Sequence, residues 1–173
     1  MAKYSDIKGF TVQTVSSDPA ASVAATGSWA TGGSLNTGRE SAGTSGTLTA
    51  GLYAGGYNIT AAVEKYDGTS WTEVSDLNTA RRQLKAAGTA NTANIVFGGD
   101  TTGNATGLQA ITETWDGSSW TEVADLATAR GGGGGAQNIS SSTSALYFGG
   151  NTGNTNTEEW TAADFLIKSV TTS

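Results

Sequence analysis

One sequence unit recurs along this chain, and the recurrence limits what the chain can fold into. A tryptophan is followed ten positions later by an arginine in WTEVSDLNTAR, from Trp71 to Arg81, and again in WTEVADLATAR, from Trp120 to Arg130. A partial copy, WATGGSLNTGR, ends at Arg39. A period of roughly 45–50 residues with this content indicates stacked supersecondary units, not one irregular domain.

Each repeat shares further positions after its arginine. A stretch of small residues leads to a glycine pair in LYAGG, IVFGG and LYFGG. A glutamate follows, with an aromatic residue two positions later and another large aromatic residue five positions after that. These sets are Glu64/Tyr66/Trp71, Glu113/Trp115/Trp120 and Glu158/Trp160/Phe165.

Short runs of apolar and small residues between turn residues predict four strands in each repeat. The expected strands cover 40–44, 48–54, 61–66 and 71–74; then 83–89, 93–97, 110–115 and 120–123; then 131–137, 144–148, 157–160 and 165–170. Asp67-Gly68 and Asp116-Gly117 separate the third and fourth strands and predict tight hairpin turns, because such a pair accepts positive φ. The third repeat has Ala162-Ala163 there, so we expect its turn to differ.

Four hairpin-linked strands in succession form one blade of a β-propeller. The expected fold is therefore all-β, with three full blades at about 39–74, 81–123 and 130–170 and a partial N-terminal unit. The glycine run 131–135 suits a crowded innermost strand. Residues 1–28 lack the repeat and hold the only proline, Pro19, so we interpret them as an arm or degenerate blade ahead of a repeat domain at 29–173.

Composition excludes several classes of function. The formal net charge is −6 and no basic run occurs, which argues against a nucleic-acid partner. The chain has no histidine and no cysteine, which excludes disulfides, thiolate chemistry and imidazole acid–base catalysis. We expect no metal and no cofactor. No stretch is long and apolar enough to span a membrane, and MAKYSDIKGF lacks the apolar run of a secretory leader.

The ordered motifs resemble the kelch repeat. The resemblance rests on the glycine pair, the Glu-x-aromatic motif, the later tryptophan, and a Leu-x-x-x-Arg motif at Leu35/Arg39, Leu77/Arg81 and Leu126/Arg130. IKGFTVQTVSSDPA at 7–20, with the GSWATGGSLNTGR segment, is also similar to kelch-like virion proteins of marine tailed bacteriophages, cyanophages especially. This implies a virion component (a tail fibre, capsid decoration or surface protein) assembled in the host cytoplasm and attached through residues 1–28.

Three blades do not easily close a ring, since propellers have about four to eight. Two copies of this chain would supply six blades. Alternatively, residues 1–38 form a fourth blade in a single chain, or another virion protein caps an open stack. We expect self-association, because exposed sheet edges favour pairing.

The repeated charged residues have two interpretations. Arg39, Arg81 and Arg130 form either a ring of cations for an anionic ligand or repeated ion pairs and carbonyl contacts that lock adjacent blades. We favour the structural interpretation, with Glu64, Glu113 and Glu158 as partners. Equivalent carboxylates in equivalent surroundings do not make a catalytic acid/base pair, so we expect no enzyme.

The loops after the second and fourth strands are expected on one face of the molecule. The second repeat has the longest such loop, with 15 positions from Gly98 to Glu113 against 9 in the other repeats. This insertion is interpreted either as tolerated drift or as an asymmetric site. The candidate binding residues on this face are Tyr57, Asn58, Asp100, Thr101, Asn104, Asn151 and Asn154.

The resemblance to phage virion proteins thus implies a non-enzymatic structural protein of a phage particle that contacts other virion proteins or a host surface. The alternative is a lectin-like module that binds a host-surface glycan, with Tyr57 and neighbouring amides on the loop face carrying recognition.

Overall fold

The computed structural model describes residues 27–136, 142–151 and 155–163. The chain divides into two compact units, 1–31 and 32–173. Of the first unit only residues 27–31 are described, and they are exposed and without regular secondary structure. The predicted arm and the predicted strand at 165–170 therefore lie wholly or almost wholly outside the described residues.

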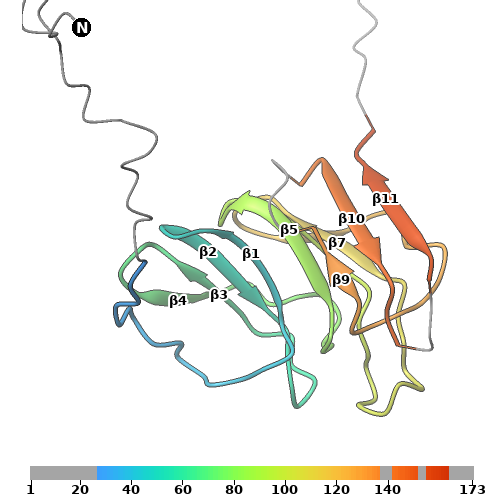
Figure 1. Ribbon diagram of the computed structural model, residues 1–173, viewed down its shortest axis with the longest axis horizontal. Coiled ribbons are helices and arrows are strands. Elements are labelled where there is room, and N and C mark those ends of the chain that lie inside the picture. The colour runs from blue at the N-terminus through green and yellow to red at the C-terminus, as the bar shows by residue number, and fades with distance from the viewer. Residues whose placement is uncertain (1–26, 137–141, 152–154, 164–173) are drawn as a thin grey trace, which may run out of the picture. The chain divides into compact units, whose positions relative to one another are not determined.

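The described part of the second unit forms three antiparallel sheets and contains no helix (Figure 1). The first sheet is ordered β1 (Gly43–Thr47), β2 (Ala50–Ala54), β3 (Val63–Tyr66), β4 (Trp71–Val74). The second is ordered β5 (Lys85–Ala90), β6 (Ala93–Phe97), β7 (Thr112–Trp115), β8 (Trp120–Glu122). The third contains β9 (Gly134–Gly135), β10 (Ser144–Phe148) and β11 (Thr157–Thr161).

The all-β prediction is confirmed, and each sheet corresponds to one sequence repeat. Neighbouring strands in each sheet are consecutive in the chain. The first strands begin later than expected, at Gly43 and Lys85 instead of 40 and 83, because the residues after each arginine still belong to the connection between sheets. The glycine run forms only the two-residue strand β9.

The hydrophobic core lies between the sheets. Strand β5 lies beside β1 of the first sheet and beside β9 of the third, so the first strands of the three sheets are neighbours (Figure 1). Between the first two sheets, Leu52, Ala54 and Val63 pack with Val96, Leu77 and the stacked rings of Trp115 and Trp120, whose centroids are 5.2 Å apart. Between the second and third sheets the core contains Ala87, Ile95, Phe97, Ala145 and Tyr147.

The two Asp-Gly turns differ from the tight turns expected. Tyr66 pairs with Trp71 and Trp115 pairs with Trp120, so each loop has four residues. Only the glycine, Gly68 or Gly117, has positive φ. In the first loop the aspartate Oδ1 accepts the N–H groups of Thr69 and Ser70, each at 2.8 Å, and Asp116 does the same in the second loop. These bonds lower the pKa of both aspartates.

A buried ion pair recurs in every sheet. In the second sheet, Arg81 Nη2 lies 2.8 Å from Glu113 Oε1, and both side chains are completely buried. Arg81 Nη1 also donates to the carbonyls of Gly98 and Ile111. Arg39 pairs with Glu64 at 2.5 Å in the first sheet, and Arg130 pairs with Glu158 in the third.

Arg81 and Arg130 also join their sheets to the preceding ones. The Arg81 side chain contacts the second sheet, whereas its backbone N–H donates to Thr60 and its carbonyl accepts from Gly56, both in the loop of the first sheet. Arg130 is bonded to Gln109 and Gly99 in the same way. The glycine pair follows from this geometry: Gly55 has φ +67, and a Cβ there would lie 2.5 Å from the Arg81 carbonyl oxygen. Arg81 and Arg130 therefore occupy structural contacts between sheets, and Arg39 occupies the equivalent ion pair within the first sheet.

We expect Glu113→Gln to lower the free energy of unfolding by about 3–5 kcal/mol, because it leaves the buried Arg81 guanidinium without a counter-charge. Glu158→Gln is the matched control, since it removes the equivalent carboxylate where the side chain is 20% exposed and water can solvate the arginine partner. Its loss should be clearly smaller. Urea unfolding followed by tryptophan fluorescence measures both, and equal losses would contradict a role for burial in this ion pair.

Candidate functional site

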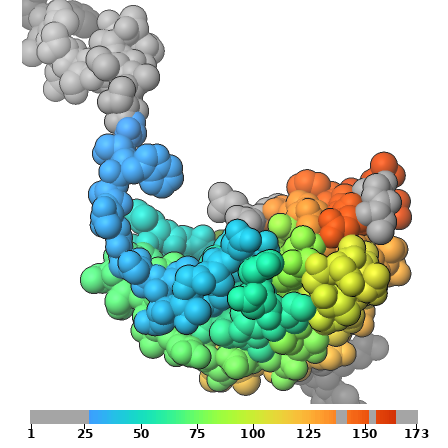
Figure 2. All heavy atoms as spheres, turned by 90° about the horizontal axis from the view of Figure 1, so that it is seen from below, coloured from blue at the N-terminus to red at the C-terminus, as the bar shows by residue number. Residues whose placement is uncertain are grey.

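Loops from the first and second repeats meet at one face of the molecule (Figure 2). The connections after β2, β4 and β6 together line a shallow hollow of about 220 Å³. Its walls are Tyr57, Asn58, Ile59, Arg82 and Gly103. The sequence placed the loops after the second and fourth strands on a common face, and in the described residues these loops do come together here.

Arg82 is the central side chain of this hollow. Its Nη2 donates to the carbonyl of Gly103, and its Nε lies 3.5 Å from Asp100 Oδ2. Its guanidinium carbon lies 5.8 Å from the centroid of the Tyr57 ring, within the range of a cation–π contact. Arg82 thus holds the insertion of the second repeat against the loop of the first.

Asp100 is a structural residue, in contrast to the exposed ligand contact expected from the sequence. It is completely buried. Its Oδ1 accepts the N–H of Thr102 at 3.0 Å and its Oδ2 accepts the N–H of Ala105 at 3.2 Å. Burial by itself would raise the pKa of Asp100, but these hydrogen bonds and the charge of Arg82 outweigh it, and the pKa is lowered. The carboxylate therefore organises the insertion from inside.

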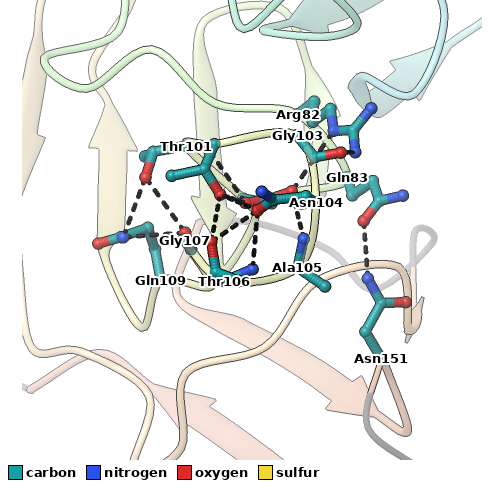
Figure 3. Close-up of polar contacts among 12 residues, drawn as sticks. Arg82, Gln83, Thr101, Gly103, Asn104, Ala105, Thr106, Gly107, Gln109 and Asn151 are labelled. Atoms are coloured by element: carbon teal, nitrogen blue, oxygen red, sulfur yellow. Dashed lines mark hydrogen bonds and ion pairs between the residues drawn. The ribbon is translucent and has the colours of Figure 1, made fainter.

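Hydrogen bonds among short polar side chains stabilise the rest of the insertion (Figure 3). Asn104 Oδ1 accepts hydrogen bonds from the hydroxyls of Thr102 and Thr106 at 2.7 and 2.6 Å. Thr101 donates both its N–H and its hydroxyl to the carbonyl of Gly107. Asn104 remains exposed, whereas Thr101 is half-buried. The insertion is thus an ordered loop, and Asn104 and its neighbours form its exposed surface.

Gln83 links the loops of the second and third repeats. Its Oε1 accepts a hydrogen bond of 2.8 Å from Asn151 Nδ2 (Figure 3). Its N–H donates to Ser41 and its carbonyl accepts from Gly132, so one residue contacts the equivalent segments of both other repeats. Asn151, expected on the binding face, is therefore engaged with Gln83.

Backbone strain concentrates around this site. Five non-glycine residues among those described have positive φ, and four of them, Asn58, Ile59, Gln83 and Ala105, lie in these loops. Positive φ is especially unfavourable for a β-branched residue such as Ile59, at φ 57. Such residues persist only where the surrounding contacts impose them, and they cluster at functional sites.

The site thus contains part of the expected set. Tyr57 is about half-exposed, at 49%, and Asn58 is exposed beside it. Asn154 lies outside the described residues. Sequence reasoning missed Arg82 and Gln83, although the repeat alignment held a clue: ARRQ carries two long polar side chains where the other repeats have GRES and ARGG.

No group of acidic side chains suited to a metal ion occurs in the described part of the chain. The described residues likewise include no helix long and apolar enough to cross a membrane. A scan against protein-family models and a search of curated proteins both gave no match.

The order of the insertion should depend on the ionised form of Asp100. Because its folded pKa is below the unfolded value of about 3.9, its contribution to stability is present above that pH and is lost as the pH falls through the folded pKa. We expect amide hydrogen-exchange protection of Ala105 to fall in strong acid, and Asp100→Asn to lower it already at pH 7. The Ser119 amide, held by Asp116, is the internal control. Unchanged protection of Ala105 in Asp100→Asn would contradict this account.

Proposed function

We propose that this protein is a non-enzymatic structural protein made of kelch-like propeller blades, carried on the surface of a tailed bacteriophage particle. The blade proposal is supported by sheets whose strands follow chain order, by the neighbouring first strands β1, β5 and β9, and by the arginine link that recurs between sheets. The virion assignment is supported by the resemblance of residues 7–20 and of the repeats to phage virion proteins.

The observation that carries the contact role is the insertion of the second repeat. It is present in one of three equivalent loops, and its own hydrogen bonds and Arg82 hold it in place. An ordered insertion gives a repetitive scaffold one distinctive surface, which suits recognition of a neighbouring virion protein or a host surface.

The engagement of the carboxylates supports a non-catalytic role. Glu64, Glu113, Glu158 and Asp100 all lie in ion pairs with arginines. General acid–base catalysis requires a carboxyl group positioned to exchange a proton with a substrate. Charges that are committed to arginines within the scaffold instead hold the blades and the insertion in shape.

Purified particles of the phage that encodes this chain should contain it, as detected by mass spectrometry. Deletion of residues 2–28 should abolish incorporation, because we assign attachment to this segment, while the far-UV circular dichroism of the purified variant should keep its β-sheet spectrum. Particles that carry the deletion variant at the normal copy number would refute attachment through these residues.

Carbohydrate binding is the second candidate function, and the hollow beside Tyr57 favours it. An exposed aromatic ring can stack on the apolar face of a sugar while neighbouring amides and guanidinium groups bond its hydroxyls. The hollow, of about 220 Å³, is smaller than the pockets of roughly 300–1,000 Å³ typical of larger ligands, and it suits a single terminal sugar.

If this second function holds, a glycan array probed with the full chain should identify a ligand, and Tyr57→Ala should weaken its binding by about tenfold or more, equivalent to about 1.4 kcal/mol per factor of ten. Tyr57→Phe keeps the ring and should bind nearly as well. Leu48→Ala, at an exposed residue in a turn of the first sheet, is the control for a remote surface change. An array without hits, or equal loss in the Leu48 variant, would exclude this site.

A further inference from the structure

The outer face of the third sheet, marked by Leu146 and Phe148, is open where the equivalent faces of the other sheets are closed. Phe148 is 44% exposed, whereas Phe97 at the same repeat position is 2% exposed. Leu146 is half-buried, whereas its counterpart Ile95 is completely buried. In the first and second sheets this face is covered by the following sheet. Among the described residues, no sheet follows the third one.

The inner face of the first sheet, which carries Tyr66 and Trp71, also lacks a covering sheet among the described residues. Their rings stack with centroids 5.0 Å apart, much like Trp115 and Trp120 in the second sheet. The second pair is buried under the first sheet, at 2% and 7% exposure, whereas Tyr66 and Trp71 are both partly exposed. This face has the chemistry of an interface between sheets, and no described sheet precedes it.

The connecting segment before the first sheet is bonded to that sheet in the same way as the connection before the second sheet. The N–H of Asn36 donates to Glu64 and its side chain to Trp71, as Asn78 does to Glu113 and Trp120 in the next repeat. These bonds fix one side of the segment on its own sheet.

The other side of each later connection bonds to the preceding sheet. Leu77 N–H donates to Ala61, and Leu126 N–H donates to Ala110. The equivalent N–H groups of Leu35 and Arg39 make no hydrogen bond to any described residue. Gly150 is the counterpart of Gly56 and Gly99, which bond the next arginine, and its N–H makes none to a described residue either. The N–H groups of Leu35 and Arg39 in the first repeat and of Gly150 in the third are therefore the groups that would form one further interface between sheets.

Among the described residues the third sheet has no fourth strand, and the strand expected at 165–170 lies outside them. In the described residues β11 is its edge, whereas the other sheets add β4 and β8, which begin at Trp71 and Trp120. Each of these tryptophans precedes the leucine of its connection by six positions, and Trp29 precedes Leu35 by the same interval. Trp29 is fully exposed.

The third sheet has a hollow at the matching place. It lies beside Trp160 and is lined by Phe97, Ala124, Leu126 and Tyr147, among others. In the space between the first two sheets, Trp120 stacks on Trp115 and donates from Nε1 to the carbonyl of Ser75, the counterpart of Ala124. The hollow is therefore where the large aromatic residue that begins a fourth strand would lie, either Trp29 of another copy or Phe165 of the same chain.

We propose that residues 29–39 of one copy of this chain complete the third sheet of a second copy, in the position that 165–170 would occupy if each chain completed its own third sheet. Trp29 starts a fourth strand beside the partner's β11, the Leu35–Arg39 segment bonds the partner's glycine-pair loop, and the inner face of the first sheet covers the partner's Leu146 and Phe148. The inference rests on the proposed propeller architecture. A second copy is the occupant because this chain carries both halves of an interface that it already makes twice internally. Two copies give six sheets, within the usual range of about four to eight, and two such head-to-tail contacts close the ring.

A disulfide test can establish this register, since the chain has no cysteine of its own. Thr114 on β7 lies directly opposite Thr121 on β8, and their counterparts are Glu159 and Ala30. Residues opposite each other in antiparallel strands have Cα atoms about 4.5–5.5 Å apart, which a disulfide spans. We therefore expect the full chain with Ala30→Cys and Glu159→Cys to form covalent dimers on mild oxidation, seen at about twice 17.4 kDa on a non-reducing gel.

The matched control carries Ala30→Cys and Leu48→Cys, which places the second thiol at an exposed turn outside the proposed contact and should give no specific dimer. Monomers with an internal disulfide would show that one chain closes on itself, and monomers with free thiols would show no such register; either result overturns the proposal. Sedimentation gives a second readout: the unaltered chain should be a dimer, Trp29→Ala with Phe148→Glu a folded monomer, and Leu48→Glu still a dimer. The purified chain suffices, so the outcome is independent of any role on a particle or in sugar binding.

Discussion

The buried arginine–glutamate pair is the interaction on which the arrangement of the sheets depends. Removing two charges from water is expensive, and the pair persists only because its remaining polar atoms are also bonded. Arg81 donates to two carbonyls as well as to Glu113, and Glu113 also accepts the N–H of Asn78. These partners come from the connection before the sheet, from the loop between β6 and β7, and from β7 itself. The pair therefore fixes the position of each connection on its sheet, and the arginine backbone then fixes the preceding sheet.

Much of this scaffold was predictable because the pattern repeats and each position has a physical reason. The aromatic residues stack between sheets, and the glycine pair accepts positive φ where the arginine carbonyl approaches. The turns were predicted less well, because Asp67 and Asp116 act through their carboxylates, which accept N–H groups across a four-residue loop. Dipeptide preference alone does not distinguish this from a two-residue turn.

The candidate site was less predictable, because it departs from the repeat. Asp100 was expected at the surface, yet the insertion folds over it and uses it as an internal acceptor. Arg82 and Gln83 follow the structural arginine and belong to no repeat motif. Their importance depends on contacts with loops far away in sequence, Gly103 for Arg82 and Asn151 for Gln83. Pattern reasoning identifies equivalent positions well, whereas a site built from non-equivalent residues becomes visible only in three dimensions.

The first and the last of the described sheets each lack one of the two neighbours that the middle sheet has. A sheet in this architecture satisfies one face and one connection through the sheet before it, and its other face and glycine-pair loop through the sheet after it. The middle sheet has both neighbours, and Glu113 and Trp115 are buried there. The end sheets keep the same aromatic and glycine positions although Trp71 and Phe148 stay partly open. Stacked repeats need either polar caps or further neighbours, and aromatic end faces are poor caps, so the composition of the ends itself favours a completing partner.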